Sequence, residues 1–348
     1  MKLAPPGFWQ GRSALDRALG AALSPLGHLY DGAGAARWAR ATPASAPVPV
    51  LCVGNLTLGG TGKTPLALAL ADRLRARGRK PGFLTRGYGG RLEGPLAVDP
   101  SVHGAREVGD EPLLLAASAP TILARDRVAG AGLAPGLGID CLIMDDGFQN
   151  PALAKTACVL VIDAEAGLGN GRVFPAGPLR EAPGRGLARA DLVILMGEGP
   201  GPRILAGWPG PVVRARLAPA PDAVRFRGRA VVAFAGIGRP AKFFSTLTGL
   251  GARLAGAHAL ADHAVPGEGF LSRLASAAEA AGAVLVTTAK DAVRLSPAWR
   301  ARVDVLEVTV ELEEEGPVEA LLDRLSGAAM DHGLHPRPET LKPHQPQR

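Results

Sequence analysis

A glycine-rich turn, between an apolar run at 50–54 and a helical pattern starting at Lys63, constrains this chain more than any other segment. In a phosphate-binding loop, glycines free backbone N–H groups to surround phosphate oxygens, a lysine reaches the outer phosphates and the adjacent hydroxyl holds Mg²⁺. The usual pattern has glycine where this chain has Thr57. Because a strand and a helix flank the turn as the motif requires, we interpret it as a phosphate cradle rather than an ordinary strand–helix turn. Its residues are Gly59, Gly60, Thr61, Gly62, Lys63 and Thr64.

A second apolar run, 141–144, ends in two adjacent acids, Asp145 and Asp146. In phosphate-loop proteins an aspartate at the tip of a neighbouring strand orders the Mg²⁺ that the loop hydroxyl also touches. Successive strand side chains face opposite ways, so the two acids share a role only if the chain turns there, which Gly147 permits. Taken alone, such acids are also common as plain loop residues. Beside the upstream loop, they predict a metal carboxylate.

Strand-like and helix-like segments alternate along the chain, which predicts an α/β fold with a parallel sheet and a site at the carboxyl ends of the strands. Arg86, Arg125, Arg127 and the two acids follow such strands. A second alternation begins near Arg229, after a Pro/Gly-rich stretch. We therefore expect a P-loop NTPase-like domain at 32–225 and a smaller α/β domain at 226–330. They would be preceded by a helix within 1–31 and followed by a disordered tail at 331–348.

The composition of the chain limits the classes of partner that it is expected to bind. A net charge of +7 and a pI near 9.8 favour anionic partners such as a nucleotide, a phosphorylated substrate or anionic lipid. Only 4% of the 348 residues are aromatic, which disfavours nucleic acid as a partner. The three cysteines lie in apolar runs without metal-ligand spacing, as expected of reduced, buried residues. No obligate protein partner is indicated.

The segment from Phe8 to Tyr30 has leucines at helical spacing, with charged residues on other faces. An amphipathic helix of this kind, with Phe8 and Trp9 at its start and Pro25 as a kink, lies in a membrane interface or packs on its own domain. The pattern leaves both readings open. No apolar run approaches the length of a membrane span.

The ordered set of motifs resembles the tetraacyldisaccharide 4′-kinases of lipid A biosynthesis over nearly the whole chain. The segments that carry the resemblance are Gly54-Asn55 with 59–65, 86–89, 109–112, 145–149, 169–171 with 175–181, Asp262-His263, and Thr288 with 290–293. The resemblance implies ATP-dependent phosphorylation of the 4′-hydroxyl of an acylated glucosamine disaccharide 1-phosphate. It also implies a peripheral position at the cytoplasmic face of the bacterial inner membrane, which favours the membrane reading of 8–30.

The resemblance and the demands of phosphoryl transfer together suggest roles. Lys63 and the loop amides would bind the β- and γ-phosphates of ATP, and Thr64 with Asp146 would hold Mg²⁺, supported by Glu111. Asp110 is the expected base for the 4′-hydroxyl, with His263 from the second domain orienting it or tuning its pKa. The plain alternatives are a helix N-cap for Asp110 and a polar loop position for His263.

Six further residues are expected to contact the substrate or the transferred phosphate, because guanidinium groups match phosphate and polar side chains match sugar. They are Asn55, Arg86, Tyr88, Arg125, Arg127 and Gln149. The chain departs from the family pattern at Asn150, where His is usual, and at Ala289, where Glu is usual. The roles of Arg180 and Glu181 do not follow from the sequence.

Two other classes of protein remain as alternatives. Membrane-associated regulatory ATPases share the Gly-Gly-x-Gly-Lys-Thr loop, but they carry a lysine just before the two glycines, where this chain has Leu58. A non-enzymatic nucleotide-binding module acting on nucleic acid is disfavoured by the scarcity of aromatic residues.

Overall fold

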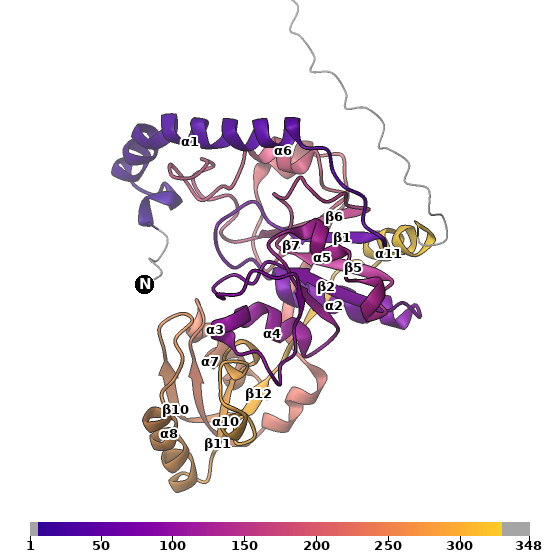
Figure 1. Ribbon diagram of the computed structural model, residues 1–348. Helices are drawn as coiled ribbons and strands as arrows, with labels where there is room; N and C mark the ends of the chain where they lie inside the picture. Colours follow the sequence, from indigo (N-terminus) through magenta and orange to yellow (C-terminus); the bar gives the residue numbers. More distant parts are fainter. Residues whose placement is uncertain (1–5, 329–348) are drawn as a thin grey trace, which may run out of the picture.

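The computed structural model describes residues 6–328, which form two lobes, each a largely parallel β-sheet with helices on its faces (Figure 1). Parallel neighbours need a crossover connection that a helix supplies, so this architecture follows from the alternation in the sequence. It confirms the expected α/β class. The expected tail at 331–348 and the first residues of the segment 1–31 lie outside the described residues.

The larger lobe is built on a nine-stranded sheet. Its strands are β1 (Val50–Gly54), β2 (Pro81–Thr85), β3 (Leu96–Ala97), β4 (Thr121–Leu123), β5 (Cys141–Asp145), β6 (Ala157–Asp163), β7 (Leu192–Met196), β8 (Val212–Pro219) and β13 (Val308–Leu312). Their order is β13-β8-β7-β6-β1-β5-β2-β4-β3, and only the two edge strands β13 and β3 are antiparallel to their neighbours. The central strands β1 and β5 are buried at every position, as expected of apolar strands covered on both faces.

The helices of the larger lobe are α1 (Ala14–Arg40), α2 (Lys63–Ala76), α3 (Ala105–Val108), α4 (Asp110–Ala116), α5 (Arg127–Ala131), α6 (Pro183–Leu187) and α11 (Gly316–Ala328), with 3-10 turns η1 (Gly7–Gln10), η2 (Pro135–Leu137) and η3 (Arg203–Gly207). Along β1, Leu51 and Val53 pack with α2 and α11 on one face of the sheet. Val50 and Cys52 pack on the opposite face, with α5 and α6. This alternation places the carboxyl end of β1 between two cores.

The smaller lobe has a parallel four-stranded sheet of order β10-β9-β11-β12, made of β9 (Ala230–Ala235), β10 (Arg253–Ala259), β11 (Val284–Thr288) and β12 (Asp304–Leu306). Its helices are α7 (Pro240–Gly249), α8 (Glu268–Ala280), α9 (Ala289–Ala292) and α10 (Pro297–Arg300), and the turn η4 (Pro221–Phe226) leads into it. In Figure 1 the larger lobe meets this lobe through α3 and α4, and α4 contacts α9.

The chain returns to the larger lobe at its end, which differs from the expected division at 226–330. Residues 304–312 form two strands, of which β12 belongs to the small sheet and β13 pairs with β8 of the large one. Helix α11 then buries Val318, Leu321 and Leu322 in the core that α2 also lines. The sequence pattern could not show this, because a strand edge accepts any suitable partner and the pairing partner lies about 90 residues upstream.

Helix α1 is longer than expected, at 27 residues, and contains Pro25. Ser13 caps it, since its hydroxyl accepts from the amide of Asp16 while the Asp16 carboxylate accepts from the amide of Ser13. Gly20 and Gly27 are its buried residues, and they approach the segment 170–176 closely. One face of α1 therefore packs on its own lobe. This packing is one of the two alternatives that the sequence left open. Among residues 6–328, no helix is long and apolar enough to cross a membrane.

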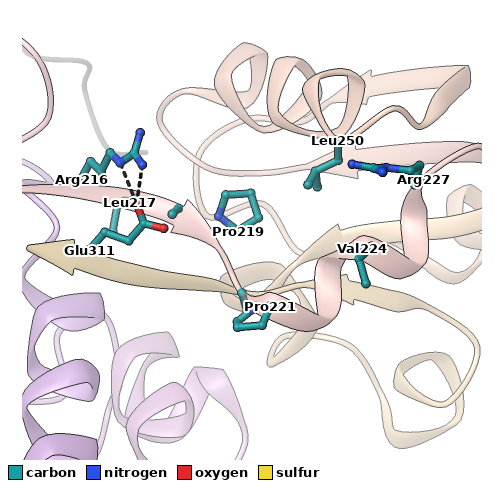
Figure 2. A pocket seen from close by; sticks show the side chains of 10 residues that line it. Arg216, Leu217, Pro219, Pro221, Val224, Arg227, Leu250 and Glu311 are labelled. Atoms are coloured by element: carbon teal, nitrogen blue, oxygen red, sulfur yellow. Dashed lines mark hydrogen bonds and ion pairs between the residues drawn. The ribbon is translucent and has the colours of Figure 1, made fainter.

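A shallow pocket of about 410 Å³ lies where the chain first crosses between the lobes (Figure 2). Pro219 and Pro221 line it with Val224 and Leu250, and the Arg216–Glu311 ion pair lies at one side. It shares no residue with the phosphate loop or the adjacent acids.

Candidate active site

The phosphate loop has the backbone geometry that anion binding requires. Gly59 and Gly62 have φ values of 127° and 84°, which side chains other than glycine rarely adopt. A Cβ atom added at Gly59 or Gly60 would meet nothing within 4 Å, so the space above the loop is open to a ligand. Helix α2 begins directly after, at Lys63, and directs its N-terminus at that space.

The two acids at the end of β5 face different partners. The Thr64 hydroxyl donates to Asp145 Oδ2 at 2.9 Å, whereas Asp146 lies 3.6 Å from Lys63 Nζ and accepts from Arg180 Nη1 at 2.9 Å. Asp146 itself makes the turn, with a φ of 55°. The structure therefore brings Thr64 together with Asp145, where we had expected Asp146. Asp146 instead lies between the side chains of Lys63 and Arg180 at the mouth of the loop.

Their environments push the pKa values of these acids in opposite directions. Burial, followed by the negative charge of Glu111, raises the pKa of Asp145 to about 7. Burial also acts on Asp146, but Lys63 and Arg180 outweigh it, so the pKa of Asp146 is lowered. Asp145 Oδ1 has no hydrogen-bond partner among the described residues. A buried carboxylate with an unpaired oxygen beside a second acid has the chemistry of a cation ligand.

The donors fit Mg²⁺ rather than a metal held by the protein alone. Within residues 6–328, no three histidine, cysteine or acidic side chains lie close enough to enclose an ion. Mg²⁺ is usually bound by one or two carboxylates together with substrate phosphates and water. The Thr64 hydroxyl and the Asp145 carboxylate, with Glu111 nearby, are such a partial set.

Asp110 and His263 meet across the two lobes. His263 Nδ1 lies 2.7 Å from Asp110 Oδ2, and Arg294 Nη2 donates to the same oxygen at 2.7 Å. His263 Nε2 lies 3.2 Å from the Nζ of Lys290, which is a donor. An ammonium facing Nε2 favours the tautomer with an unprotonated Nε2, whose Nδ1 proton points to Asp110. Arg294 Nη2 also lies 3.2 Å from Nδ1. The sequence prediction that these two residues form a pair agrees with this geometry.

The carboxylate of Asp110 is held in its charged form. Burial raises its pKa, but hydrogen bonds from His263 and Arg294 outweigh burial and bring the pKa of Asp110 down to about 2. The alternative role of helix N-cap does not apply, because Gly109 occupies the N-cap of α4 and Asp110 is its first residue. The Asp110 side chain instead accepts hydrogen bonds from His263 and Arg294 of the smaller lobe.

The expected substrate arginines differ in their surroundings. Arg127 is buried and donates to the Ala124 carbonyl, and burial, followed by the charge of Arg86, lowers the pKa of Arg127 to about 10. Arg86 is exposed close to it. Arg125 is exposed and paired with Glu93 at 2.5 Å. Arg127 thus lies near the two acids with Arg86 beside it, while Arg125 is engaged on the surface.

Asn55 and Gln149 support the loop, which differs from the sugar contacts we expected. Asn55 is fully buried, and its amide donates to the carbonyl of Thr57 at 2.8 Å. Gln149 Nε2 donates to the Asn55 carbonyl at 2.9 Å and to Glu181 Oε1 at 3.0 Å. The two side-chain amides therefore fix the backbone of residues 55–57, which lead into the phosphate loop. Tyr88, by contrast, is 65% exposed, and its carbonyl lies against Gly109, the residue before Asp110.

Three residues of the site were not assigned by the sequence. Arg180 reaches Asp146, Lys290 reaches His263, and Arg294 reaches Asp110. Arg180 and Lys290 lie within motifs of the family resemblance, which was the available signal. Arg294 follows directly after such a motif, and its side chain is fully buried between Asp110 and Asp291.

Since β5 pairs with β1, Asp145 reaches the hydroxyl of Thr64, and the phosphate loop and a metal acid come to one edge of the sheet. A second lobe brings an imidazole and cations to the same edge. Fold and site together define the class of phosphate-loop phosphotransferases.

Comparisons with known proteins all indicate the same family. The family model described as Tetraacyldisaccharide-1-P 4′-kinase matches residues 19–326. The tetraacyldisaccharide 4′-kinase of Rhodospirillum rubrum is 50% identical over 327 residues, which are 92% of this chain and 97% of that protein. The protein of the same name from Methylorubrum extorquens strain PA1 is 53% identical over 317 residues, covering 89% and 95% of the two chains.

Among solved structures, the "apo" form of LpxK from Aquifex aeolicus in complex with ATP is similar, with a TM-score of 0.70 and 27% identity, covering 88% of this chain and 99% of that one. The chain belongs to the tetraacyldisaccharide-1-P 4′-kinase family. It is accordingly a kinase of lipid A biosynthesis that uses ATP, and a lipid A precursor is its substrate.

Proposed function

We propose that the loop at 59–64 carries the phosphoryl transfer, with its amides and Lys63 on the β- and γ-phosphates of ATP. The open space above Gly59 and Gly60 and the helix N-terminus at Lys63 support this assignment. Lys63 is only 11% exposed and lies 3.6 Å from Asp146. Its charge is therefore held at the mouth of the loop before ATP arrives, and it would move from Asp146 toward the phosphates on binding.

Thr64 and Asp145 are the proposed holders of Mg²⁺, with Glu111 in support, and Asp146 becomes the partner of Lys63 and Arg180. Bound there, the ion would neutralise charge on the phosphate oxygens during transfer. The raised pKa of Asp145 and its unpaired Oδ1 support this choice over Asp146. Lys63 and Arg180 both contact Oδ1 of Asp146, so the charge of this acid is already balanced by two cations.

Proton removal from the 4′-hydroxyl is assigned to the Asp110–His263 pair. We expected Asp110 as the base, but a carboxylate whose pKa is about 2 accepts protons weakly near neutral pH. We therefore assign the acceptor to Nε2 of His263, with Asp110 fixing the Nδ1 proton and stabilising the imidazolium that forms. The acceptor hydroxyl would take the place of Lys290 at Nε2.

Substrate binding is assigned to residues on both sides of the loop. Arg127 lies near the acids with Arg86 beside it, and both suit the transferred phosphate. Tyr88, which is exposed and whose carbonyl lies against Gly109, is assigned to the sugar. Arg125 would serve a substrate phosphate only by leaving Glu93. Asn55 and Gln149 are assigned to supporting the loop rather than to the sugar.

Helix α1 is the proposed contact with the cytoplasmic face of the inner membrane. Its exposed large apolar residues fall within an arc of about 100° along the helix, a single stripe. They are Leu15, Leu19, Leu26, Leu29 and Tyr30. Phe174 packs edge-on against Tyr30 and Trp9 at one side, which adds aromatic surface suited to a lipid interface. The opposite, glycine-bearing face stays on the protein.

The single observation that carries these roles is the meeting of Thr64 with Asp145 and of Asp110 with His263 at one edge. ATP consumption measured with and without a micellar acylated disaccharide 1-phosphate tests them. A kinase depends strictly on the acceptor, whereas a regulatory ATPase turns over without it. Acceptor-independent hydrolysis at an equal rate would contradict the proposal.

A further inference from the structure

A continuous set of side chains joins the last turn of α1 to the phosphate loop. The guanidinium carbon of Arg189 lies 4.4 Å from the ring centroid of Trp38, and 5.0 Å from that of Phe148. Two aromatic contacts restrict the orientation of a guanidinium group. Arg189 is also tied to the backbone, since its Nη1 donates to the Arg185 carbonyl at 3.0 Å.

Arg189 neutralises a buried acid that faces the loop. Its Nη2 lies 2.7 Å from both carboxylate oxygens of Glu181, which is 6% exposed. Glu181 Oε1 also accepts from Gln149 Nε2 at 3.0 Å, and that same nitrogen donates to the Asn55 carbonyl at 2.9 Å. Asn55 follows β1 directly, and its Nδ2 donates to the carbonyl of Gly59, the first residue of the phosphate loop, at 3.4 Å. The position of Trp38 is thus transmitted through Asn55 to the start of the loop.

The set has a second branch to the cations of the site. Gln149 Oε1 accepts from Arg180 Nη1 at 3.4 Å, and the same Nη1 donates to Asp146 at 2.9 Å. Arg37, one residue before Trp38, donates to the Gln149 carbonyl at 3.3 Å. Helix α1 therefore contacts Gln149 both directly and through Arg189.

We propose that Arg189 is a positioning residue that couples the docking of α1, through Trp38, to the geometry of the phosphate loop. The inference rests on the proposed role of the loop as the ATP site. If α1 needed only to be packed in place, apolar side chains would suffice. A buried carboxylate held by a charged partner and by an amide costs desolvation, and it specifies one orientation of the groups around it. Loss of Trp38 or Arg189 then frees Gln149, and the loop loses a fixed anchor.

The test is equilibrium binding of ATP to the full-length protein without acceptor, together with kcat. Trp38→Leu and Arg189→Met should each weaken ATP binding roughly tenfold, the effect expected when one charge-assisted hydrogen bond no longer holds the loop. The double variant should be little worse than the worse single variant, because both changes break one connection. Trp38→Phe keeps a ring and should bind ATP nearly as the wild type.

Trp208→Leu is the matched control. Trp208 is a half-buried tryptophan of the same lobe whose indole donates to the Leu187 carbonyl at 3.2 Å, outside the coupled set. It should lower the melting temperature without changing the Kd for ATP. If Trp38→Leu also lowers only the melting temperature, or if the two losses multiply in the double variant, the coupling is refuted. Failure of the loop assignment is separate: it would appear as Lys63→Ala retaining full ATP affinity and turnover.

Discussion

Asp145→Asn is expected to stabilise the ligand-free protein at pH 8 while abolishing phosphoryl transfer. Burial, then the charge of Glu111, raises the pKa of Asp145 from 3.8 to about 7. Because the folded state then binds the proton more tightly than the unfolded chain, the free energy of unfolding falls as pH rises from about 4 to about 7. A shift of about 3 pKa units corresponds to a penalty of at most ~4 kcal/mol at pH 8.

The net gain is smaller than this penalty. Asparagine keeps an oxygen that can accept from Thr64, but its NH₂ group falls where Oδ1 has no partner among the described residues. An unsatisfied buried donor costs about 1–3 kcal/mol, so the variant should gain about 1–3 kcal/mol at pH 8. At pH 5 the penalty of the wild type falls below about 2 kcal/mol, and the advantage should disappear.

Urea unfolding followed by tryptophan fluorescence at pH 5 and pH 8, without Mg²⁺, measures both quantities, and acceptor-dependent ATP consumption measures activity. Asp146→Asn is the control, because Lys63 and Arg180 lower the pKa of Asp146 and its neutralisation should destabilise the protein at pH 8. An Asp145→Asn variant that is less stable than the wild type at pH 8, or whose difference is the same at both pH values, would refute the buried-charge reasoning.

Three further predictions concern the site and α1. Lys63→Ala should lower acceptor-dependent turnover by about 10²-fold or more while the protein stays folded, and a residual rate above about a tenth of wild type would place the cradle elsewhere. Asp110→Ala and His263→Ala should each lower kcat strongly, with a double variant little worse than the worse single one. Multiplicative losses would show that the two act independently. Leu26→Ser combined with Leu29→Ser should move the protein from phospholipid vesicles to the supernatant at equal stability, since both side chains are exposed, at 53% and 71%; unchanged partition would contradict the lipid contact.

Much of the architecture was predictable because it is encoded locally. Strand, glycine turn and helix are contiguous from Val50 onward, and the backbone itself forms the phosphate cradle, so neighbouring residues suffice to predict it. The acids at the end of β5 and the pairing of Asp110 with His263 were also expected, the latter from the family resemblance. The boundary of the second lobe was not, since β13 pairs with a strand far away in the chain.

The sequence by itself determined which chemical groups this protein has, and the tertiary structure decided which of them meet. Two adjacent acids look alike in sequence, yet the turn at Asp146 leaves Asp145 facing Thr64 and gives Asp146 to Lys63 and Arg180. Arg294 carries no local signal, and it reaches Asp110 only because the smaller lobe docks there. The physical reason is that periodicity and turn chemistry act over a few residues. Charge pairing and burial act through space, between residues whose approach is fixed by strand order and by the docking of the lobes.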